Sequence, residues 1–397
     1  MSDTTVRDEN EQKVFELCQQ LLETHPPAST DERAFLEAQF DLGLAWVHFP
    51  VGEGGLGLSP KLQRTVIQTL SGAGAPIGGQ KNPIGYGMCA PAVQVHGTEE
   101  QKQLLRPLFS NEHVWCQMFS EPGAGSDVAS LSMRADRDGD EWIVTGQKVW
   151  TTLAHVASYG LVIARTDPEL PKHKGITAFI VDMHAPGVEV RPLRQMTGEA
   201  EFNEVYLTEV RIPDSMRLDE VGRGWAVSIT TLMNERVSIG GGTPPRGAGP
   251  IGQLVEAWKR SGSDDPVRRD RVTHLWALAE VNRLTNLRAA QMRSAGTPGP
   301  EGSVAKLAMA EANKEIYSLA MDLMGAEGML YGSYELVRPR HALFTDDMHK
   351  NFLRARANSI EGGTSEVLRN IIGERVLGLP GDVRVDKDLP WKDVPRS

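Results

Sequence analysis

Glu235 is a carboxylate at a position where the sequence pattern calls for an apolar side chain. In the stretch GWAVSITTLMNERVSIGGG it lies three positions after Leu232 and four before Ile239, on a stripe of helical spacing. A lone buried carboxylate is costly, so it is usually paired or functional. It could form an internal ion pair with Arg236 or another arginine, which composition alone favours, or act as a base that removes a proton. The apolar members of the stripe are Trp225, Ile229, Leu232 and Ile239.

A second candidate base, Glu361, precedes a pair of glycines in SIEGGTSEVLRN, at residues 359–370. The pattern predicts that a helix starts just after the glycines, so Glu361 stands at a junction between a loop and a helix. A base that works near neutral pH needs a partly desolvated carboxylate whose pKa has risen towards the working pH. Either glutamate could meet this requirement.

A glycine-rich turn in QMFSEPGAGSDVASL, at residues 117–131, carries hydroxyl groups on both sides. Pro122, Gly123 and Gly125 predict a tight turn, and Ser120 and Ser126 flank it. Taken alone, this pattern is best explained as a well-capped β-turn. Its meaning depends on the elements around it.

Three regions of different periodicity follow one another along the chain. Helical spacing extends to about residue 110 and returns from Gly222 to about Leu379. Between them lie short segments rich in β-branched residues with no helical pattern separating them, which predicts a compact β domain without parallel βαβ units. The predicted domains are helical (1–114), β (115–222), and helical with an extended tail (223–397). The strand segments are 142–152, 160–166, 175–183, 187–193 and 203–213.

Composition excludes several classes of function. The net charge of −10 and the lack of a basic stretch argue against nucleic-acid binding, and no apolar run is long enough to cross a bilayer. The polar, acidic N-terminus is unlike a targeting signal, so a cytoplasmic location is expected. Cys18, Cys89 and Cys116 lack metal-ligand spacing, which predicts reduced thiols and no metal site. Two matches to the dinucleotide pattern, at 52–57 and 247–252, lack its strand and helix context and predict ordinary turns.

Four motifs in order resemble those of the acyl-CoA dehydrogenase family. EPGAGSD and KVWTT (148–152) are similar to its two flavin-binding signatures, which read close to TEP-x-AGSD and K-x-W-I-T. HGTEEQK (96–102) and GGTSEVLRNIIGERVLGLP (362–380) also resemble family segments at matching separations. The resemblance covers nearly the whole chain. It implies an α+β fold with an N-terminal helical domain, a middle antiparallel β domain and a C-terminal four-helix bundle, with FAD held between the last two.

The activity implied by this resemblance is an FAD-dependent oxidation of an acyl-CoA thioester. The product would be a trans-2-enoyl-CoA, in fatty-acid or branched acyl-CoA catabolism, and the electrons would pass to an electron-transferring flavoprotein. One alternative is an oxidase of the same fold that uses O₂, and another is an FAD-holding subunit of a heteromeric dehydrogenase. The net charge argues against a nucleic-acid-associated relative without catalysis. The implied assembly is a homodimer or homotetramer, with a heterotetramer as the alternative.

The resemblance also assigns roles to single residues. It implies that Ser120 bonds the pyrimidine edge of the flavin, that Thr152 lies near flavin N5 and that Trp150 packs on the ring face opposite the substrate. Ser126 would approach the pantetheine or phosphate part of the thioester. The implied cofactor contacts are Phe119, Ser120, Gly125, Ser126, Trp150, Thr151, Thr152, Thr364 and Glu366, and the implied substrate contacts are Ser126, Arg236 and Gly363.

The same resemblance bears on the choice between the two glutamates. In many members the base immediately precedes the Gly-Thr of the last motif, and here that position is Gly362. A branch similar to isovaleryl-CoA dehydrogenase takes its base from the other helix, in a Glu-Arg pair that Glu235-Arg236 matches. Glu235 is therefore the predicted base and Glu361 the alternative.

The chain departs from the family pattern in three places. The Arg-x-x-Phe-Gly element that reaches the cofactor of a neighbouring subunit is absent, and Arg246 is the candidate substitute. MDLMGAEGM (321–329) replaces a Gln-x-x-Gly-Gly run, and Met233 stands where an aspartate often binds pantetheine. No motif therefore predicts the contacts between subunits.

Overall fold

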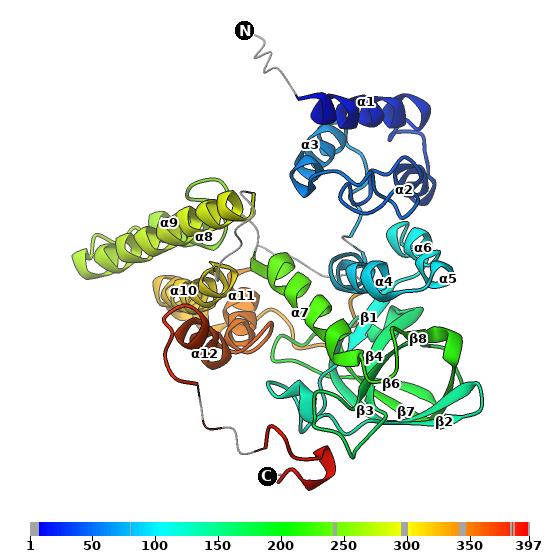
Figure 1. Cartoon of the computed structure of the whole chain (residues 1–397). Helices are drawn as coiled ribbons and strands as arrows, with labels where there is room; N and C mark the ends of the chain where they lie inside the picture. The colour runs from blue at the N-terminus through cyan, green and yellow to red at the C-terminus, as the bar shows by residue number, and fades with distance from the viewer. Residues whose placement is uncertain are drawn as a thin grey trace.

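The computed structural model describes residues 8–79, 81–240, 244–294, 301–340, 347–381, 383 and 386–395. It leaves undescribed the side chains of residues 236–240, 293, 294 and 301. Within this part of the chain, helices come first, a β-sheet follows and further helices come after it (Figure 1). This order confirms the predicted α+β architecture.

Capping side chains mark the starts of the N-terminal helices. Asp8 accepts a hydrogen bond from the backbone N of Glu11, and Asp31 accepts bonds from the first turn of its helix. Thr98 and Gln101 form a reciprocal capping box. The helices are α1 (Glu9–Thr24), α2 (Glu32–Asp41), α3 (Gln63–Gly72), α4 (Ala90–His96), α5 (Glu99–Lys102) and α6 (Leu105–Phe109).

The sheet contains eight strands in the order β6-β7-β3-β2-β4-β5-β8, with β1 paired to β4. Most neighbours are antiparallel, as predicted, but β1 and β2 each run parallel to β4. The five predicted segments match β3 to β7 closely, whereas β1, β2 and β8 were not predicted. The strands are β1 (Trp115–Met118), β2 (Arg134–Asp138), β3 (Glu141–Thr152), β4 (Tyr159–Arg165), β5 (Ile176–Asp182), β6 (Val188–Pro192), β7 (Phe202–Pro213) and β8 (Arg217–Leu218).

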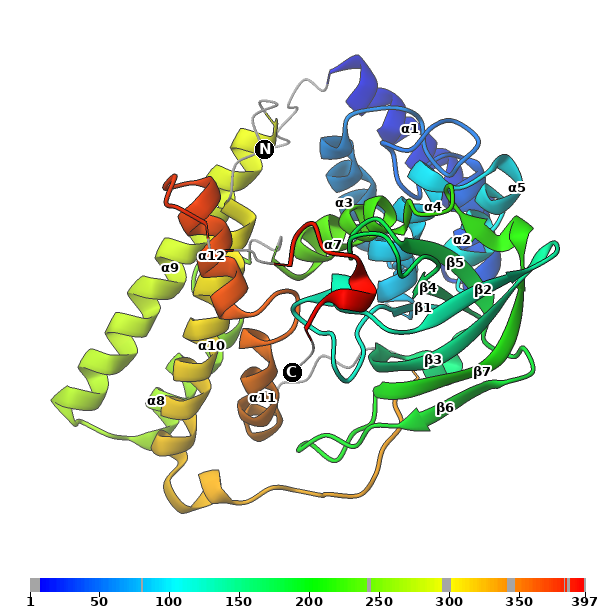
Figure 2. The same ribbon diagram turned by 60° about the horizontal axis from the view of Figure 1, so that its bottom comes forward.

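The helices after the sheet lie to one side of it, and α7 lies between the two parts (Figures 1 and 2). α10 contacts α7, α8, α9, α11 and α12, so it is the central helix of the bundle. The helices are α7 (Gly224–Gly240), α8 (Pro250–Ser261), α9 (Pro266–Ser294), α10 (Glu301–Met324), α11 (Met348–Arg354) and α12 (Ser365–Arg375).

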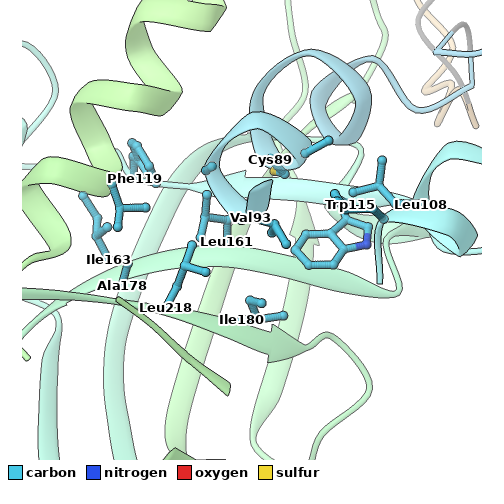
Figure 3. Close-up of a cluster of buried hydrophobic side chains, with 14 of the residues drawn as sticks. Cys89, Val93, Leu108, Trp115, Phe119, Leu161, Ile163, Ala178, Ile180 and Leu218 are labelled. Atoms are coloured by element: carbon cyan, nitrogen blue, oxygen red, sulfur yellow. The ribbon is translucent and has the colours of Figure 1, made fainter. Parts of the chain in front are cut away.

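One hydrophobic core joins the N-terminal helices to the sheet. Val93 of α4 and Leu108 of α6 lie over Trp115 of β1, close to Leu161 of β4 and Ile180 of β5 (Figure 3). Val227 of α7 belongs to the same cluster. Burying this apolar surface fixes α4, α6 and α7 on the sheet.

A buried ion pair fixes the EPGAGSD turn to β3. The side chain of Lys148 is fully buried, and its Nζ lies 2.9 Å from Glu121 Oε1 and 3.0 Å from the Phe119 carbonyl. Glu121 also accepts hydrogen bonds from the backbone N–H groups of Ser132 (2.6 Å) and Met133 (2.9 Å). Burial lowers the pKa of Lys148, and the Glu121 carboxylate opposes that shift. A pair with this many donors can offset its cost of desolvation.

The C-terminal tail returns from the bundle to the sheet. The Trp391 ring lies beneath the guanidinium of Arg165, 4.9 Å from its Cζ, and its Nε1 donates to the carbonyl of Ser130. Lys172 lies between Asp127 and Asp386, at 2.7 and 2.8 Å. The tail is therefore docked behind the EPGAGSD turn.

We expect Lys148→Met to lower the free energy of unfolding by about 3–5 kcal/mol, because Glu121 would stay buried without its positive partner. Methionine keeps most of the aliphatic part of the lysine side chain, so the loss of stability measures the removal of the charge rather than the opening of a cavity. Urea denaturation followed by tryptophan fluorescence measures this change.

The matched control is Arg211→Met on β7. Arg211 pairs with Asp138 (3.0 Å) and Glu141 (2.9 Å), but its side chain is 54% exposed. Exposed pairs contribute about 1 kcal/mol or less. Equal losses in the two variants would contradict the role given to the buried pair.

Candidate active site

Two hydrogen bonds hold the EPGAGSD turn against the second motif. The backbone N of Val149 donates to the carbonyl of Ser120 (2.9 Å), one residue after the Lys148 contact to Phe119. Phe119 is buried, and Ser120 is partly buried. Ser120 therefore lies beside the end of β3.

Trp150 on β3 has a backbone conformation that is uncommon for a residue other than glycine, with φ of 60°. The pairing of β3 with β7 shifts register between Lys148 and Thr151, so Trp150 lies in an irregular part of the ladder. Its side chain is 56% exposed and meets the Phe202 ring edge-on, with 5.9 Å between centroids. Such a conformation costs about 1–3 kcal/mol and clusters at functional sites. The result is a flat aromatic surface available to a ligand.

Oγ1 of Thr151, the residue after Trp150 on β3, is buried and has no hydrogen-bond partner among the described residues. Other buried polar atoms also lack a partner there, among them Gln117 Oε1 and Trp115 Nε1 on β1. Buried polar groups are nearly always satisfied, so a polar ligand at the end of β3 would supply a missing partner. Hydroxyls at Ser120 and Thr152 add further polar groups beside Trp150. This set fits a flat ring system with a polar edge, as in a flavin.

The other end of the turn is open. Gly125 and Ser126 are exposed, and no described heavy atom lies within 4 Å of a Cβ built at Gly123 or Gly125. Asp127, the next residue, is tied to Lys172. The open edge thus presents the Ser126 hydroxyl and bare backbone, which allows a ligand to approach closely.

Glu361 is fully engaged by neighbouring donors. Its two carboxylate oxygens accept from Arg354 at 3.1 and 2.7 Å, and Asn358 Nδ2 donates to Oε1 at 3.0 Å. A bidentate guanidinium contact is a strong, directional ion pair that occupies both oxygens of the carboxylate. This geometry suits a structural anion better than a proton acceptor.

The turn after Glu361 has a backbone that favours glycine. Gly362 and Gly363 have φ values of 62° and 92°, in the region that side chains avoid. A glutamate at position 362 would be strained in this conformation. The backbone conformation at position 362 therefore favours glycine over the glutamate that many family members have there.

Glu235 lies near the end of α7 and is partly buried. The buried face of this helix consists of Val227, Ser228 and Thr231, and Glu235 follows Thr231 by four residues. Ile229 of the predicted apolar stripe is instead 41% exposed. The hydroxyls of Ser228 and Thr231 donate hydrogen bonds to the backbone carbonyls four residues earlier. These bonds satisfy the hydroxyls inside the protein, so polar residues are buried on a face where the hydropathy pattern predicted apolar ones.

Contacts at both sides fix the position of α7. A Cβ at Gly224 would lie 2.7 Å from the backbone of Thr177, so the helix starts directly against β5. His96, the first residue of HGTEEQK, contacts Thr230 of α7 through Nε2 (2.9 Å) and Asp219 through Nδ1 (2.8 Å). The HGTEEQK motif therefore orients the helix that carries Glu235.

A cluster of charges joins the bundle to the sheet beside Trp150. Arg354 contacts Glu361 and lies 3.6 Å from Glu201, and its guanidinium lies over the Phe202 ring at 5.6 Å. Burial raises the pKa of Glu201, and Arg354 opposes that shift. Lys350 pairs with Glu199 at 2.5 Å. Through Phe202, the cluster connects Glu361 to the exposed tryptophan.

The remaining predicted residues are placed as follows. Thr364 caps α12 by accepting from the backbone N of Val367 (3.1 Å), and Glu366 is exposed in the first turn. Gly363 contributes its carbonyl to a contact with Lys306. Arg236 lies within α7, but its side chain is outside the described residues. Arg246 lies 3.7 Å from Glu280 and over the Trp276 ring.

Motif reasoning missed Lys306, Arg354 and Glu201, which carry the charges of this junction. Their only sequence signal is a charged residue in a partly buried helix, for Lys306 and Arg354, or directly before a partly buried strand, for Glu201. Among the described residues, no group of three His, Cys, Asp or Glu side chains could hold a metal ion, and no helix is long and apolar enough to cross a membrane.

Comparisons with known proteins match all three regions of the chain. Models of the N-terminal, middle and C-terminal domains of acyl-CoA dehydrogenases match residues 2–112, 116–210 and 222–377. Acyl-CoA dehydrogenase FadE34 of Mycobacterium tuberculosis is 39% identical over 86% of this chain, which spans only 45% of that protein. Acyl-CoA dehydrogenase IpdE1 of the same organism is 35% identical over 90% of each protein.

Solved structures show the same fold. The ChsE4–ChsE5 complex from Mycobacterium tuberculosis has a chain that is 28% identical, with a TM-score of 0.70 and coverage of 96% of this chain and 100% of that one. A glutaryl-CoA dehydrogenase from Mycobacterium smegmatis, solved with FADH2, is 20% identical with a TM-score of 0.63, over 95% and 97% of the two chains. The expected family and its oxidoreductase, FAD-dependent chemistry are confirmed: the chain belongs to the acyl-CoA dehydrogenase family.

Proposed function

We propose that this chain oxidises an acyl-CoA thioester to the trans-2-enoyl-CoA, with Glu235 as the base. The observation that carries the proposal is the strained, exposed Trp150 at the junction of sheet and bundle, next to the unpartnered hydroxyl of Thr151 on β3. FAD, when bound there, accepts the β-hydrogen with its electron pair. The residues of the chain bind, orient and deprotonate the substrate.

Three groups on the sheet would hold the cofactor. Trp150 offers its ring face, Ser120 a hydroxyl to the polar edge of the flavin, and Thr152 a hydroxyl near N5. Thr151 Oγ1 gains a partner when a polar ligand edge reaches it, which removes the cost of leaving it unsatisfied. Phe119, Gly125, Thr364 and Glu366 complete the proposed cofactor contacts.

The thioester would enter along the open edge of the EPGAGSD turn. Ser126 and the bare backbone at Gly125 would contact its pantetheine or phosphate part, and Gly363 its carbonyl region. Glu235 would take the α-proton, and Arg236 would support it as the next residue of the Glu-Arg pair. Glu361 is disfavoured as the base, because Arg354 and Asn358 occupy its oxygens.

The acyl group and the electron acceptor are separate proposals. A base on α7 approaches the α-carbon from a different side than one on the 358–363 turn, which suits branched or bulky acyl groups. Solved structures described as steroid acyl-CoA dehydrogenases, 25% identical to this chain, support a bulky substrate. We propose an electron-transferring flavoprotein as acceptor, and an O₂-dependent oxidase is the alternative.

We also propose that the chain pairs with a second copy through α9. Leu278, Val281, Leu284 and Leu287 are all exposed along this helix, an unusual run for a free surface. The ChsE4–ChsE5 complex shows that chains of this fold assemble with each other, so a related second chain remains the alternative occupant.

A panel of thioesters tests the activity. Anaerobic addition of straight-chain, branched and ring-bearing acyl-CoA to the FAD-loaded protein should bleach the flavin absorbance with at least one of them. Full reoxidation in air with release of peroxide would favour the oxidase. If no thioester bleaches the flavin or forms a charge-transfer band, the dehydrogenase proposal fails.

Glu235→Gln should slow flavin reduction by about 10²–10⁴-fold, the contribution of a positioned general base. Flavin binding and the oxidised spectrum should be unchanged, because the residues on the sheet are untouched. Anaerobic stopped-flow with the best thioester measures the rate.

Glu361→Gln is the paired variant. It should lose far less rate, although the junction loses its charge-assisted contact to Arg354 and the protein should be less stable. A Glu235→Gln enzyme that reduces its flavin near the wild-type rate, while Glu361→Gln is inert, would move the base to Glu361.

Val281→Asp should weaken the proposed pairing, because a charge would be buried in the contact between two α9 helices. Analytical ultracentrifugation should show a smaller species than for the wild type, with the flavin spectrum retained. Glu256→Gln on α8, an exposed position paired with Lys259, is the control. An unchanged mass for Val281→Asp would exclude α9 as the contact.

A further inference from the structure

Asn203, near the start of β7, has a fully buried side chain whose amide contacts four neighbours. Its Nδ2 donates to the backbone carbonyls of Thr151 (3.1 Å) and Glu201 (3.1 Å), and it lies 3.2 Å from Nδ1 of His155. Its Oδ1 accepts from Nη2 of Arg338 at 3.0 Å. One side chain therefore joins the end of β3, the turn after it, the start of β7 and the segment between α10 and α11.

The chemistry of these neighbours fixes the orientation of the amide. The guanidinium of Arg338 can only donate and the carbonyl of Thr151 can only accept, so Oδ1 faces the first and Nδ2 the second. The same reasoning places the proton on His155. Its Nε2 lies 2.9 Å from the carbonyl of Pro339, so Nε2 carries the hydrogen and Nδ1 accepts from Asn203. Burial lowers the pKa of His155, and the charge of Arg338 adds to that shift, which favours this neutral form.

The carbonyl that Asn203 holds belongs to the irregular end of β3. The residues on both sides of Thr151 and Thr152 have left-handed backbone conformations, with φ of 60° at Trp150 and 57° at Leu153. The register of β3 against β7 shifts just before Thr151. Such conformations persist only where the surrounding structure fixes them, and the bond from Asn203 is one of the contacts that do so.

We propose that Asn203 is a positioning residue of the flavin site: its amide holds the carbonyl of Thr151 and so keeps the Trp150 ring and the Thr152 hydroxyl in the arrangement that receives the flavin. The inference rests on the proposed function, which places the flavin against these two side chains. A ligand binds most tightly to a segment that already has its binding conformation. If the segment relaxes, the affinity falls by the fraction of molecules that remain competent.

Asn203→Asp and Asn203→Leu test this role. Aspartate keeps the oxygen that faces Arg338 but loses the donors, and leucine has nearly the same size without polar atoms. In both variants the dissociation constant for FAD should rise about tenfold or more, because the strained segment relaxes. Release of FAD from the diluted holoenzyme, followed by the recovery of flavin fluorescence, measures this constant. The visible circular dichroism of the bound flavin should change as well, because groups around its ring move.

Asn82 provides the matched control, because it is also a buried asparagine that bonds to the backbone. It is 1% exposed, and its Nδ2 donates to the carbonyls of Leu108 (3.0 Å) and His113 (3.1 Å). Asn82→Leu should lower the urea midpoint, as Asn203→Leu does, since each leaves buried carbonyls without a donor. It should leave the dissociation constant for FAD and the flavin dichroism unchanged.

Two results would overturn the proposal. One is wild-type FAD affinity and dichroism in both Asn203 variants. The other is an equal change in Asn82→Leu, which would show that lost stability alone is responsible.

If the Asn203 variants do not fold, variants of Arg338 decide the question. Arg338→Met leaves the amide in place but removes the donor that sets its orientation, so FAD binding should weaken. Arg338→Lys can still donate and should lie closer to the wild type. Unchanged FAD affinity in Arg338→Met would then overturn the proposal. If no thioester reduces the wild-type flavin, the proposed function fails, but these FAD measurements still decide the role of Asn203.

Discussion

The buried ion pair between Lys148 and Glu121 is the constraint on which the site depends. The EPGAGSD motif is a turn, which no sheet hydrogen bonds hold in place, and the KVWTT motif is the end of strand β3. The ion pair between these two side chains sets the separation of the two motifs. The backbone N–H of Met133 donates to the oxygen of Glu121 that Lys148 also contacts, and the N–H of Ser132 donates to the other oxygen. Trp150, two residues after Lys148 on β3, has the strained backbone conformation. The buried ion pair of Lys148 with Glu121 therefore helps to hold this conformation in place.

The acidic residues discussed above divide into anchors and the proposed base. Glu199, Glu201 and Glu361 all face cations of α11, so they tie the bundle to the sheet. Glu235 lies on a different helix, positioned by His96 and by the close contact of Gly224 with β5. Under the proposed function, holding the bundle to the sheet and taking the proton are therefore assigned to separate elements.

Local patterns predicted most of the fold, and the failures have physical causes. The long strands were found from their β-branched alternation, but β2 reads RADRD, whose charged, exposed residues give no such signal. The stripe predicted on α7 was right in part, because Trp225 and Leu232 pack against the core, but Ile229 is exposed. Ser228 and Thr231 are buried instead, with their hydroxyls bonded to carbonyls of their own helix. The motifs located Trp150 and Gly362. They could not show that Arg354 satisfies Glu361, because such a contact depends on how a loop folds back on a helix.

The docked tail gives the bundle a further attachment to the sheet. The chain enters the bundle through α7, the cations of α11 contact Glu199 and Glu201, and Trp391 and Asp386 of the tail contact Arg165 and Lys172. A body held at three separate places cannot swing as a unit about any one of them. Widening the junction to admit a bulky molecule therefore requires at least one of these contacts to break.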